Sequence, residues 1–239
     1  MVQLINETVS IVKKVEFVKK NSLIHKLMRN TGIIISKSVF PKGIKKNLGN
    51  FGKYRFSHEF TFYDFYSWGK GKNNGFNKLV DLAVGKETVF DIGAHIGLCS
   101  MPVSRVLNEG GRCYAFEPAK ANIKFLKQHL KMNNINNVHV IENLVGDERL
   151  ERVGFYEMNG DSGMNTISRV KKGEIEYKKI FKSQITIDGF VKESGFVPEL
   201  IKIDVKGAEI KVLSGGQEVL RNNHPEIILS VHPKHIKDL

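Results

Sequence analysis

From residue 87 onward, short apolar runs alternate with stretches of helical periodicity. Five runs are expected to be strands: Thr88–Ile92, Arg112–Phe116, Val138–Glu142, Leu200–Asp204 and Glu226–Val231. Runs of this kind are typical of parallel strands that are buried on both faces. The segments between them predict helices over Leu98–Leu107, Lys120–Asn133 and Ala208–Arg221. The alternation predicts an α/β fold with a doubly wound, mainly parallel, Rossmann-like sheet.

An insertion interrupts this alternation after the third predicted strand. Arg152–Met158 and Asn165–Val170 are expected to pair as strands around the polar loop Asn159–Gly163. The sequence contains no internal repeat and no low-complexity tract that would indicate a solenoid or a disordered region.

The chain before residue 87 has a different pattern. Apolar positions within Val2–Asn30 recur at helical spacing with lysines between them, which predicts an amphipathic helix and a second one near Leu23–Met28. Gly32 and Pro41 are expected to break the helical pattern. Aromatic residues crowd residues 51–68, where burial in a core explains most of them better than a pocket does. We therefore expect a basic helical leader (1–50), an aromatic-rich lead-in (51–86) with a helix over Phe76–Val84, and a main domain (87–239).

Composition favours one globular core. The 239 residues are 41% hydrophobic, no apolar run is long enough for a bilayer span, and Met1–Ser10 lacks the pattern of a signal peptide. The two cysteines, Cys99 and Cys113, are too few for a disulfide scaffold and are best explained as small buried residues. These features predict a cytoplasmic protein.

Positive charge is concentrated in the leader. Residues 1–50 contain ten Lys or Arg and two Asp or Glu, which accounts for eight of the net +12 charges. Such a segment can bring a protein to a membrane surface or an acidic polymer, or it can simply be the solvated face of a helix. The charge alone does not identify a substrate.

Carboxylates mark the ends of three predicted strands. After the first strand the sequence runs Asp91-Ile-Gly93-Ala94-His95-Ile-Gly97, where glycines permit a sharp turn and a close approach of a ligand. The spacing is not that of the Gly-x-Gly-x-x-Gly dinucleotide fingerprint, and no P-loop is present. An acidic residue here favours a cationic ligand over a pyrophosphate.

The second and third strands end in further candidate binding residues. Glu117, before Pro118, lies roughly twenty residues beyond the loop, where an acidic side chain can accept hydrogen bonds from ribose hydroxyls. A surface glutamate near a helix start, with Pro118 as its first residue, is the structural alternative. Glu142 and Asn143 end the third strand and are placed to bind an adenine amino group.

These motifs resemble the FkbM-type family of class I S-adenosylmethionine-dependent methyltransferases. The resemblance rests on the strand-one loop, Ala115-Phe-Glu-Pro118, Asn133–Asn137, Thr186-Ile-Asp-Gly-Phe190, Ile201–Glu209 and Val212-Leu-Ser-Gly215. It covers residues 88–233 and implies S-adenosyl-L-methionine as cofactor. The family's activity implies methyl transfer to a hydroxyl on a sugar, glycolipid, polyketide or related small molecule.

Several further site residues follow from strand ends and from the resemblance. Asp204 is the first candidate for the base that takes the hydroxyl proton, followed by Glu209 and His232. Asn165 resembles a family position near the cofactor or acceptor. Two dispersed ligands, Asp204 and His232, do not predict a metal site.

The sequence departs from the family pattern at three places. Lys206 stands where Glu or Gln is usual, and His95 stands where Asn is common. The sequence also ends soon after the fifth strand, whereas class I methyltransferases normally add two strands there. We therefore expect the C-terminal strands to be missing. Either the chain is truncated, or the leader covers the open edge of the sheet.

Three other functions compete with this interpretation. An RNA methyltransferase would use the basic leader, although no Asn-Pro-Pro-Tyr-type segment ends the fourth strand. A nicotinamide-dependent oxidoreductase would need the glycine spacing that is absent. A non-catalytic cofactor-binding module remains the third alternative.

Overall fold

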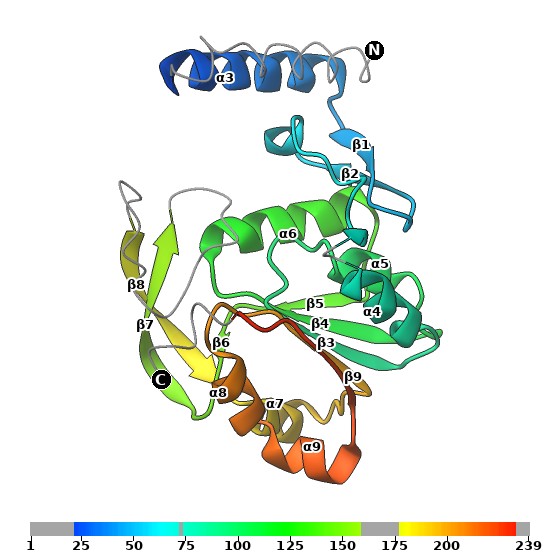
Figure 1. Ribbon diagram of the computed structural model, residues 1–239, viewed down its shortest axis with the longest axis vertical. Coiled ribbons are helices and arrows are strands. Elements are labelled where there is room, and N and C mark those ends of the chain that lie inside the picture. Colours follow the sequence, from blue (N-terminus) through cyan, green and yellow to red (C-terminus); the bar gives the residue numbers. More distant parts are fainter. Residues whose placement is uncertain (1–21, 72–73, 159–176, 233–239) are drawn as a thin grey trace. The chain divides into compact units, whose positions relative to one another are not determined.

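A computed structural model describes residues 22–71, 74–158 and 177–232 of the chain (Figure 1). The chain forms two compact units, residues 1–68 and residues 69–239. The division lies inside the segment that the sequence predicts to be an aromatic-rich lead-in. Each unit has its own elements, and the candidate site is built entirely by the second.

The first unit contains a helix and a small hairpin. Helix α3 spans Ser22–Val39, strand β1 spans Ile44–Asn47, strand β2 spans Lys53–Phe56, and the 3₁₀ helix η1 spans His58–Phe60. The strands are antiparallel, and β1 lies within the segment that the sequence predicts to be a basic helical leader. The predicted helix over residues 2–21 lies outside the described residues.

Gly32 does not break helix α3, contrary to the sequence prediction. A Cβ at Gly32 would lie 2.3 Å from Cζ of Phe62, so the missing side chain makes room for an aromatic ring. The glycine therefore serves close packing within a helix that continues to Val39.

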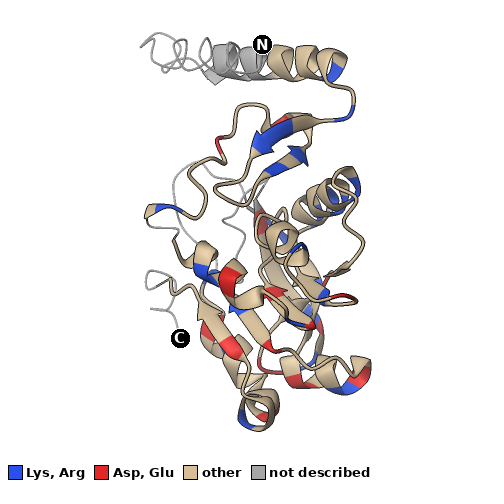
Figure 2. Ribbon diagram, turned by 90° about the vertical axis from the view of Figure 1, so that its right-hand side faces the viewer, with Lys and Arg blue, Asp and Glu red and all other residues tan. Residues whose placement is uncertain are grey.

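The aromatic-rich segment forms much of the core of the first unit. Tyr54, Phe56, Phe60 and Phe65 are buried, and the rings of Phe56 and Phe65 are 4.4 Å apart. The prediction that most of these aromatics are core residues is confirmed for these four. The hairpin strands themselves carry four basic and no acidic residues (Figure 2).

The second unit is built on a five-stranded parallel sheet. Its strands are β3 (Thr88–Ile92), β4 (Arg112–Phe116), β5 (Val138–Ile141), β9 (Leu200–Ile203) and β10 (Glu226–Leu229). Their order in the sheet is β10-β9-β3-β4-β5, and all four neighbouring pairs are parallel. The predicted doubly wound parallel sheet is confirmed, with strand bounds within two residues of those expected.

Helices cover both faces of this sheet (Figure 1). Helices α4 (Gly75–Ala83), α5 (Ser100–Ser104) and α6 (Lys120–Met132) lie on one face. Helices α7 (Ile187–Ser194), α8 (Glu209–Ser214) and α9 (Gln217–Asn223) lie on the other. Phe90, Tyr114 and Ile201 from three adjacent strands pack into the apolar cluster beneath the second set. Burial on both faces of the central strands β9, β3 and β4 explains why they are mainly apolar runs.

A second sheet of three strands accounts for the insertion. Strands β6 (Leu144–Val145), β7 (Leu150–Met158) and β8 (Tyr177–Ile185) have the order β6-β8-β7. Strand β7 pairs antiparallel with β8, a strand that the sequence analysis did not predict. Residues 159–176, which include the predicted strand Asn165–Val170, lie outside the described part of the chain.

Two predicted helices are shorter than their apolar periodicity suggests. The region Leu98–Leu107 is helical only over α5, where Pro102 sits in the first turn, the part of a helix that tolerates proline. The region Ala208–Arg221 divides into α8 and α9 at Gly215. A Cβ at Gly215 would lie 1.9 Å from the carbonyl oxygen of Gly146, so the backbones approach too closely for any other residue.

Both cysteines are buried thiols. Burial raises the pKa of Cys99 and that of Cys113 above the usual thiol range. We expect neither to react with 5,5′-dithiobis(2-nitrobenzoic acid) in the folded chain at neutral pH, and both to react in guanidinium chloride. Rapid reaction of either thiol in the folded chain would contradict this burial.

Strand β10 forms one edge of the described sheet. Ile227 and Leu229 on this strand, and Val231 just after it, are exposed apolar side chains. No helix within the described ranges is both long and apolar enough to cross a membrane.

Candidate active site

The strand order reverses between β3 and β9, at the carboxyl ends of these two strands. From β3 the chain continues outward through β4 and β5, whereas β9 and β10 lie on its other side. In open α/β sheets, ligands bind at this topological switch point. The predicted residues Gly93 and Asp204 follow β3 and β9 directly, and the Asp204 amide donates to the Ile92 carbonyl at 3.0 Å.

The loop after β3 is held in an unusual backbone conformation. Gly93, His95 and Gly97 all have positive φ angles, of 81°, 52° and 90°. The amides of Gly93 and Ala94 both donate to the Phe116 carbonyl at the end of β4. The four predicted loop residues therefore form one turn that is fastened to the neighbouring strand.

Glu117 closes the same turn from the end of β4. Its Oε2 accepts from the His95 amide at 2.9 Å, and its Oε1 accepts from the Ala119 amide at 2.9 Å and from Asn122 Nδ2 at 3.1 Å. Burial raises the pKa of Glu117, and these three hydrogen bonds partly oppose the increase. Sequence reasoning placed Glu117 beside the loop, and the structure brings the two together.

The other predicted cofactor residues are more dispersed. Pro118 is half-buried and precedes α6, which begins at Lys120 and not at the proline. Glu142 is exposed and pairs with Lys127 at 2.6 Å, while Asn143 Nδ2 donates to Ser183 Oγ at 2.7 Å. Asn165 lies outside the described residues.

Asp91 lies below the mouth of the site, in a buried ion pair. It is a register partner of Lys202 on β9, and Lys202 Nζ is 2.8 Å from Asp91 Oδ1. Asp91 Oδ2 also accepts from Ser100 Oγ at 2.6 Å. Both charged residues are at most 2% exposed, so Asp91 neutralises a lysine of its own chain.

Lys202 is the residue that sequence reasoning missed. Its Nζ donates to the Gly93 carbonyl at 2.8 Å, which fastens the β3 loop to β9. Burial lowers the pKa of Lys202, but the charges of Asp91 and Asp204 raise it by more. The available signal was a lysine between two isoleucines in one apolar run and an aspartate within another.

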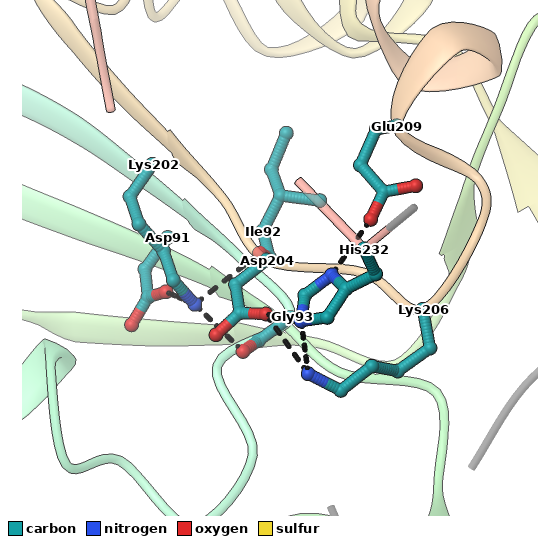
Figure 3. A network of polar contacts seen from close by, with 8 residues as sticks. All are labelled: Asp91, Ile92, Gly93, Lys202, Asp204, Lys206, Glu209 and His232. Carbon is teal, nitrogen blue, oxygen red and sulfur yellow. Dashed lines mark hydrogen bonds and ion pairs between the residues drawn. The ribbon is translucent and has the colours of Figure 1, made fainter. Parts of the chain in front are cut away.

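Four polar residues, from the segments that follow β9 and β10 and from the first turn of α8, meet at this edge of the sheet (Figure 3). Lys206 Nζ is 3.3 Å from Asp204 Oδ1 and 2.6 Å from His232 Nε2. His232 Nδ1 is 2.8 Å from Glu209 Oε1, and its Nε2 is 3.5 Å from Asp204 Oδ1. The three predicted catalytic residues are therefore brought together, with Lys206 among them.

Asp204 carries a negative charge in this cluster. Burial raises the pKa of Asp204, but the positive charges of Lys202 and Lys206, the contribution of His232 and the Lys206 hydrogen bond lower it by more. The cluster thus offers a carboxylate, an imidazole and an ammonium group side by side, which suits proton transfer and the binding of a polar substrate.

The donor and acceptor set at this edge fits S-adenosylmethionine. Glu117 Oε2 accepts one hydrogen bond from the described residues, and a carboxylate oxygen has capacity for two. That capacity suits a ribose hydroxyl, and the loop after β3 supplies a backbone turn beside it. The fit is therefore between the hydrogen-bonding groups of these residues and those of the cofactor.

The sheet order, the helices on both faces and the turn at the switch point define a doubly wound, Rossmann-like α/β fold. The Methyltransferase FkbM domain family matches residues 91–238, more than half of the chain. The chain therefore belongs to the FkbM methyltransferase family, as its motifs predicted.

Three solved structures are among those to which the chain is similar. A methyltransferase FkbM from Methylobacillus flagellatus KT is 20% identical, with 61% of this chain and 32% of that chain covered and a TM-score of 0.43. A precorrin-6y C5,15-methyltransferase from Geobacter metallireducens is 15% identical, covering 71% and 67%, with a TM-score of 0.40. An O-methyltransferase from Bacillus cereus, in complex with SAH, is 13% identical, covering 87% and 64%, with a TM-score of 0.33. No match was found among curated proteins.

Proposed function

We propose that this chain transfers a methyl group from S-adenosyl-L-methionine to a hydroxyl of a sugar, glycolipid or related small molecule. The observation that carries the proposal is the meeting of two groups of residues at one switch point. The loop that is hydrogen-bonded to Glu117 supplies groups that would bind the cofactor. The cluster around Asp204 supplies groups that would transfer protons.

Glu117 and the loop after β3 would hold the cofactor. Glu117 would accept from the ribose hydroxyls, the turn from Gly93 to Gly97 would pack against the cofactor, and Glu142 with Asn143 would contact the adenine. Asn165 and Pro118 complete the proposed set. When bound, S-adenosylmethionine supplies a methyl group that is activated by a positively charged sulfur.

The acceptor would bind next to the cluster of Asp204, Glu209 and His232. An aliphatic hydroxyl is almost wholly protonated at neutral pH, so transfer benefits from a base within hydrogen-bond reach. Holding the hydroxyl in line with the methyl carbon supplies much of the remaining rate enhancement. The neighbouring lysines keep Asp204 ionised at the mouth, where it can accept a hydrogen bond from a sugar hydroxyl.

The cofactor assignment predicts the outcome of a titration with S-adenosylhomocysteine. We expect micromolar binding by calorimetry, no detectable binding after Glu117→Ala, and no binding of NAD. Glu193→Ala is a matched control because Glu193 makes an exposed ion pair with Arg149, distant in sequence from the loop. Equal affinity in the wild-type chain and Glu117→Ala would contradict the assignment.

The acceptor class can be tested with a defined panel and radiolabelled S-adenosylmethionine. The panel contains neutral methyl glycosides, methyl glycosides of uronic acids, a glycolipid in detergent, and a short RNA. Label in a glycoside or glycolipid is expected, and methyl–oxygen linkage is confirmed by mass spectrometry. Label in RNA alone, with affinity that falls steeply with salt, would favour the nucleic-acid alternative. Cofactor binding without transfer to any acceptor would favour the non-catalytic module.

A further inference from the structure

The contacts of His232 define which of its ring nitrogens carries the proton. Lys206 Nζ lies 2.6 Å from Nε2, and an ammonium group can donate hydrogen bonds but cannot accept them. Nε2 must therefore be the bare, accepting nitrogen. The proton is on Nδ1, which donates to Glu209 Oε1 at 2.8 Å.

Glu209 is built to hold this orientation. It lies in the first turn of α8, is 3% exposed, and uses Oε1 for the bond to His232. Its Oε2 has no hydrogen-bond partner among the described residues. Burying a carboxylate with so few partners is costly, and the contact that it does make orients a histidine at the mouth of the site.

Asp204 is less suited to accept a proton. The positive charges of Lys202 and Lys206, together with the contribution of His232 and the Lys206 hydrogen bond, outweigh burial and lower the pKa of Asp204. A carboxylate held in its ionised form has little tendency to take a proton from an alcohol. Its contact with Lys206, at 3.3 Å, gives it a different role as the partner of that ammonium group.

We propose that His232 is the catalytic base, that Glu209 is its positioning residue, and that Lys206 occupies the place on Nε2 that the acceptor hydroxyl takes during the reaction. This assignment rests on the proposed function. In the step, the acceptor oxygen bonds to the methyl carbon while the carbon–sulfur bond breaks and its electron pair passes to sulfur. The hydroxyl proton passes to His232 Nε2, and the imidazolium formed is stabilised by Glu209. Lys206 remains beside Asp204.

The first test reads the tautomer of His232 by nitrogen-15 NMR of the labelled full chain, without any substrate. His232→Asn assigns the signal. We expect the proton on Nδ1 in the wild-type chain and in Glu209→Gln, whose amide oxygen can still accept. Glu209→Met removes the acceptor and is expected to move the proton to Nε2. A wild-type proton on Nε2, or no change in Glu209→Met, would overturn the positioning role.

The second test measures single-turnover methyl transfer to the panel member that the wild-type chain methylates. His232→Asn is expected to reduce the rate by about 100-fold or more, and Asp204→Asn by less than about tenfold. Glu209→Gln should retain more activity than Glu209→Met, in step with the tautomer. A larger loss in Asp204→Asn than in His232→Asn would overturn the assignment of the base.

The variant Lys206→Met tests the last part of the proposal, that Lys206 occupies the place of the acceptor hydroxyl on His232 Nε2. Without the competing ammonium group, the KM for a neutral acceptor is expected to fall several-fold, whereas Lys211→Met, on the exposed ion pair with Asp147, controls for loss of a nearby charge. An increased KM in Lys206→Met would show that Lys206 binds the acceptor and overturn its role as a placeholder. If the wild-type chain methylates nothing in the panel, the proposed function and the role of His232 as a base fail, and the NMR result still decides how Glu209 positions it.

Discussion

Lys202→Met is expected to lower the free energy of unfolding by about 3–5 kcal/mol, because it leaves the Asp91 carboxylate buried without its charge partner. The two side chains are at most 2% exposed, and the lysine also donates to the Gly93 carbonyl. The substitution removes a charge pair and a loop contact together. Urea unfolding followed by circular dichroism measures the loss.

Two further variants separate burial from charge. The Lys127–Glu142 pair is as short as the Lys202–Asp91 pair but exposed, so Lys127→Met should cost less than about 1 kcal/mol. The double variant Asp91→Asn with Lys202→Met leaves no unpaired charge in the core. It should be less destabilised than the sum of the two single variants. A loss below about 1 kcal/mol in Lys202→Met would show that Asp91 does not depend on it.

The parallel sheet could be predicted from the sequence because burial on both faces leaves a strong pattern. Strands such as Thr88–Ile92 are mainly apolar runs, and an identical range is a strand in the structure. The hairpin of β1 and β2 could not be predicted in this way. Its two short strands contain three lysines and an arginine and few apolar residues. The partner of β7 was also hidden, since β8 reads as a charged segment with alternating apolar residues.

In the candidate site, too, the sequence could predict some features and not others. Strand ends located Glu117, Asp204 and His232, because polar residues after apolar runs gather at one edge of a parallel sheet. The sequence could not show that Lys206 contacts both Asp204 and His232, which depends on the path of the chain after β9. Nor could the sequence distinguish Asp91 from the carboxylates that lie at the end of the sheet, such as Glu117 and Asp204. The register that pairs Asp91 with Lys202 turns it into the core.

Gly93→Ala is expected to damage both the fold and the proposed cofactor site. A Cβ at Gly93 would lie 2.2 Å from the Asp204 carbonyl oxygen, and the residue has a φ angle of 81°. The backbone after β9 cannot give way without moving Asp204, so the loop and the cluster of Asp204, Lys206, Glu209 and His232 would be forced apart. Strain from the positive φ contributes about 1–2 kcal/mol, and the steric conflict adds about 1–3 kcal/mol.

Gly110→Ala isolates the steric part of this effect. Gly110 has nearly the same φ angle, 79°, but nothing lies within 4 Å of the position that its Cβ would take. Unfolding in urea should show a loss of about 1–2 kcal/mol in Gly110→Ala and a clearly larger one in Gly93→Ala. Calorimetry should show a tenfold or greater loss of S-adenosylhomocysteine affinity, by about 1.4 kcal/mol or more, only in Gly93→Ala. Equal losses of stability would mean that the contact with Asp204 can relax, and that the φ angle alone requires a glycine after β3.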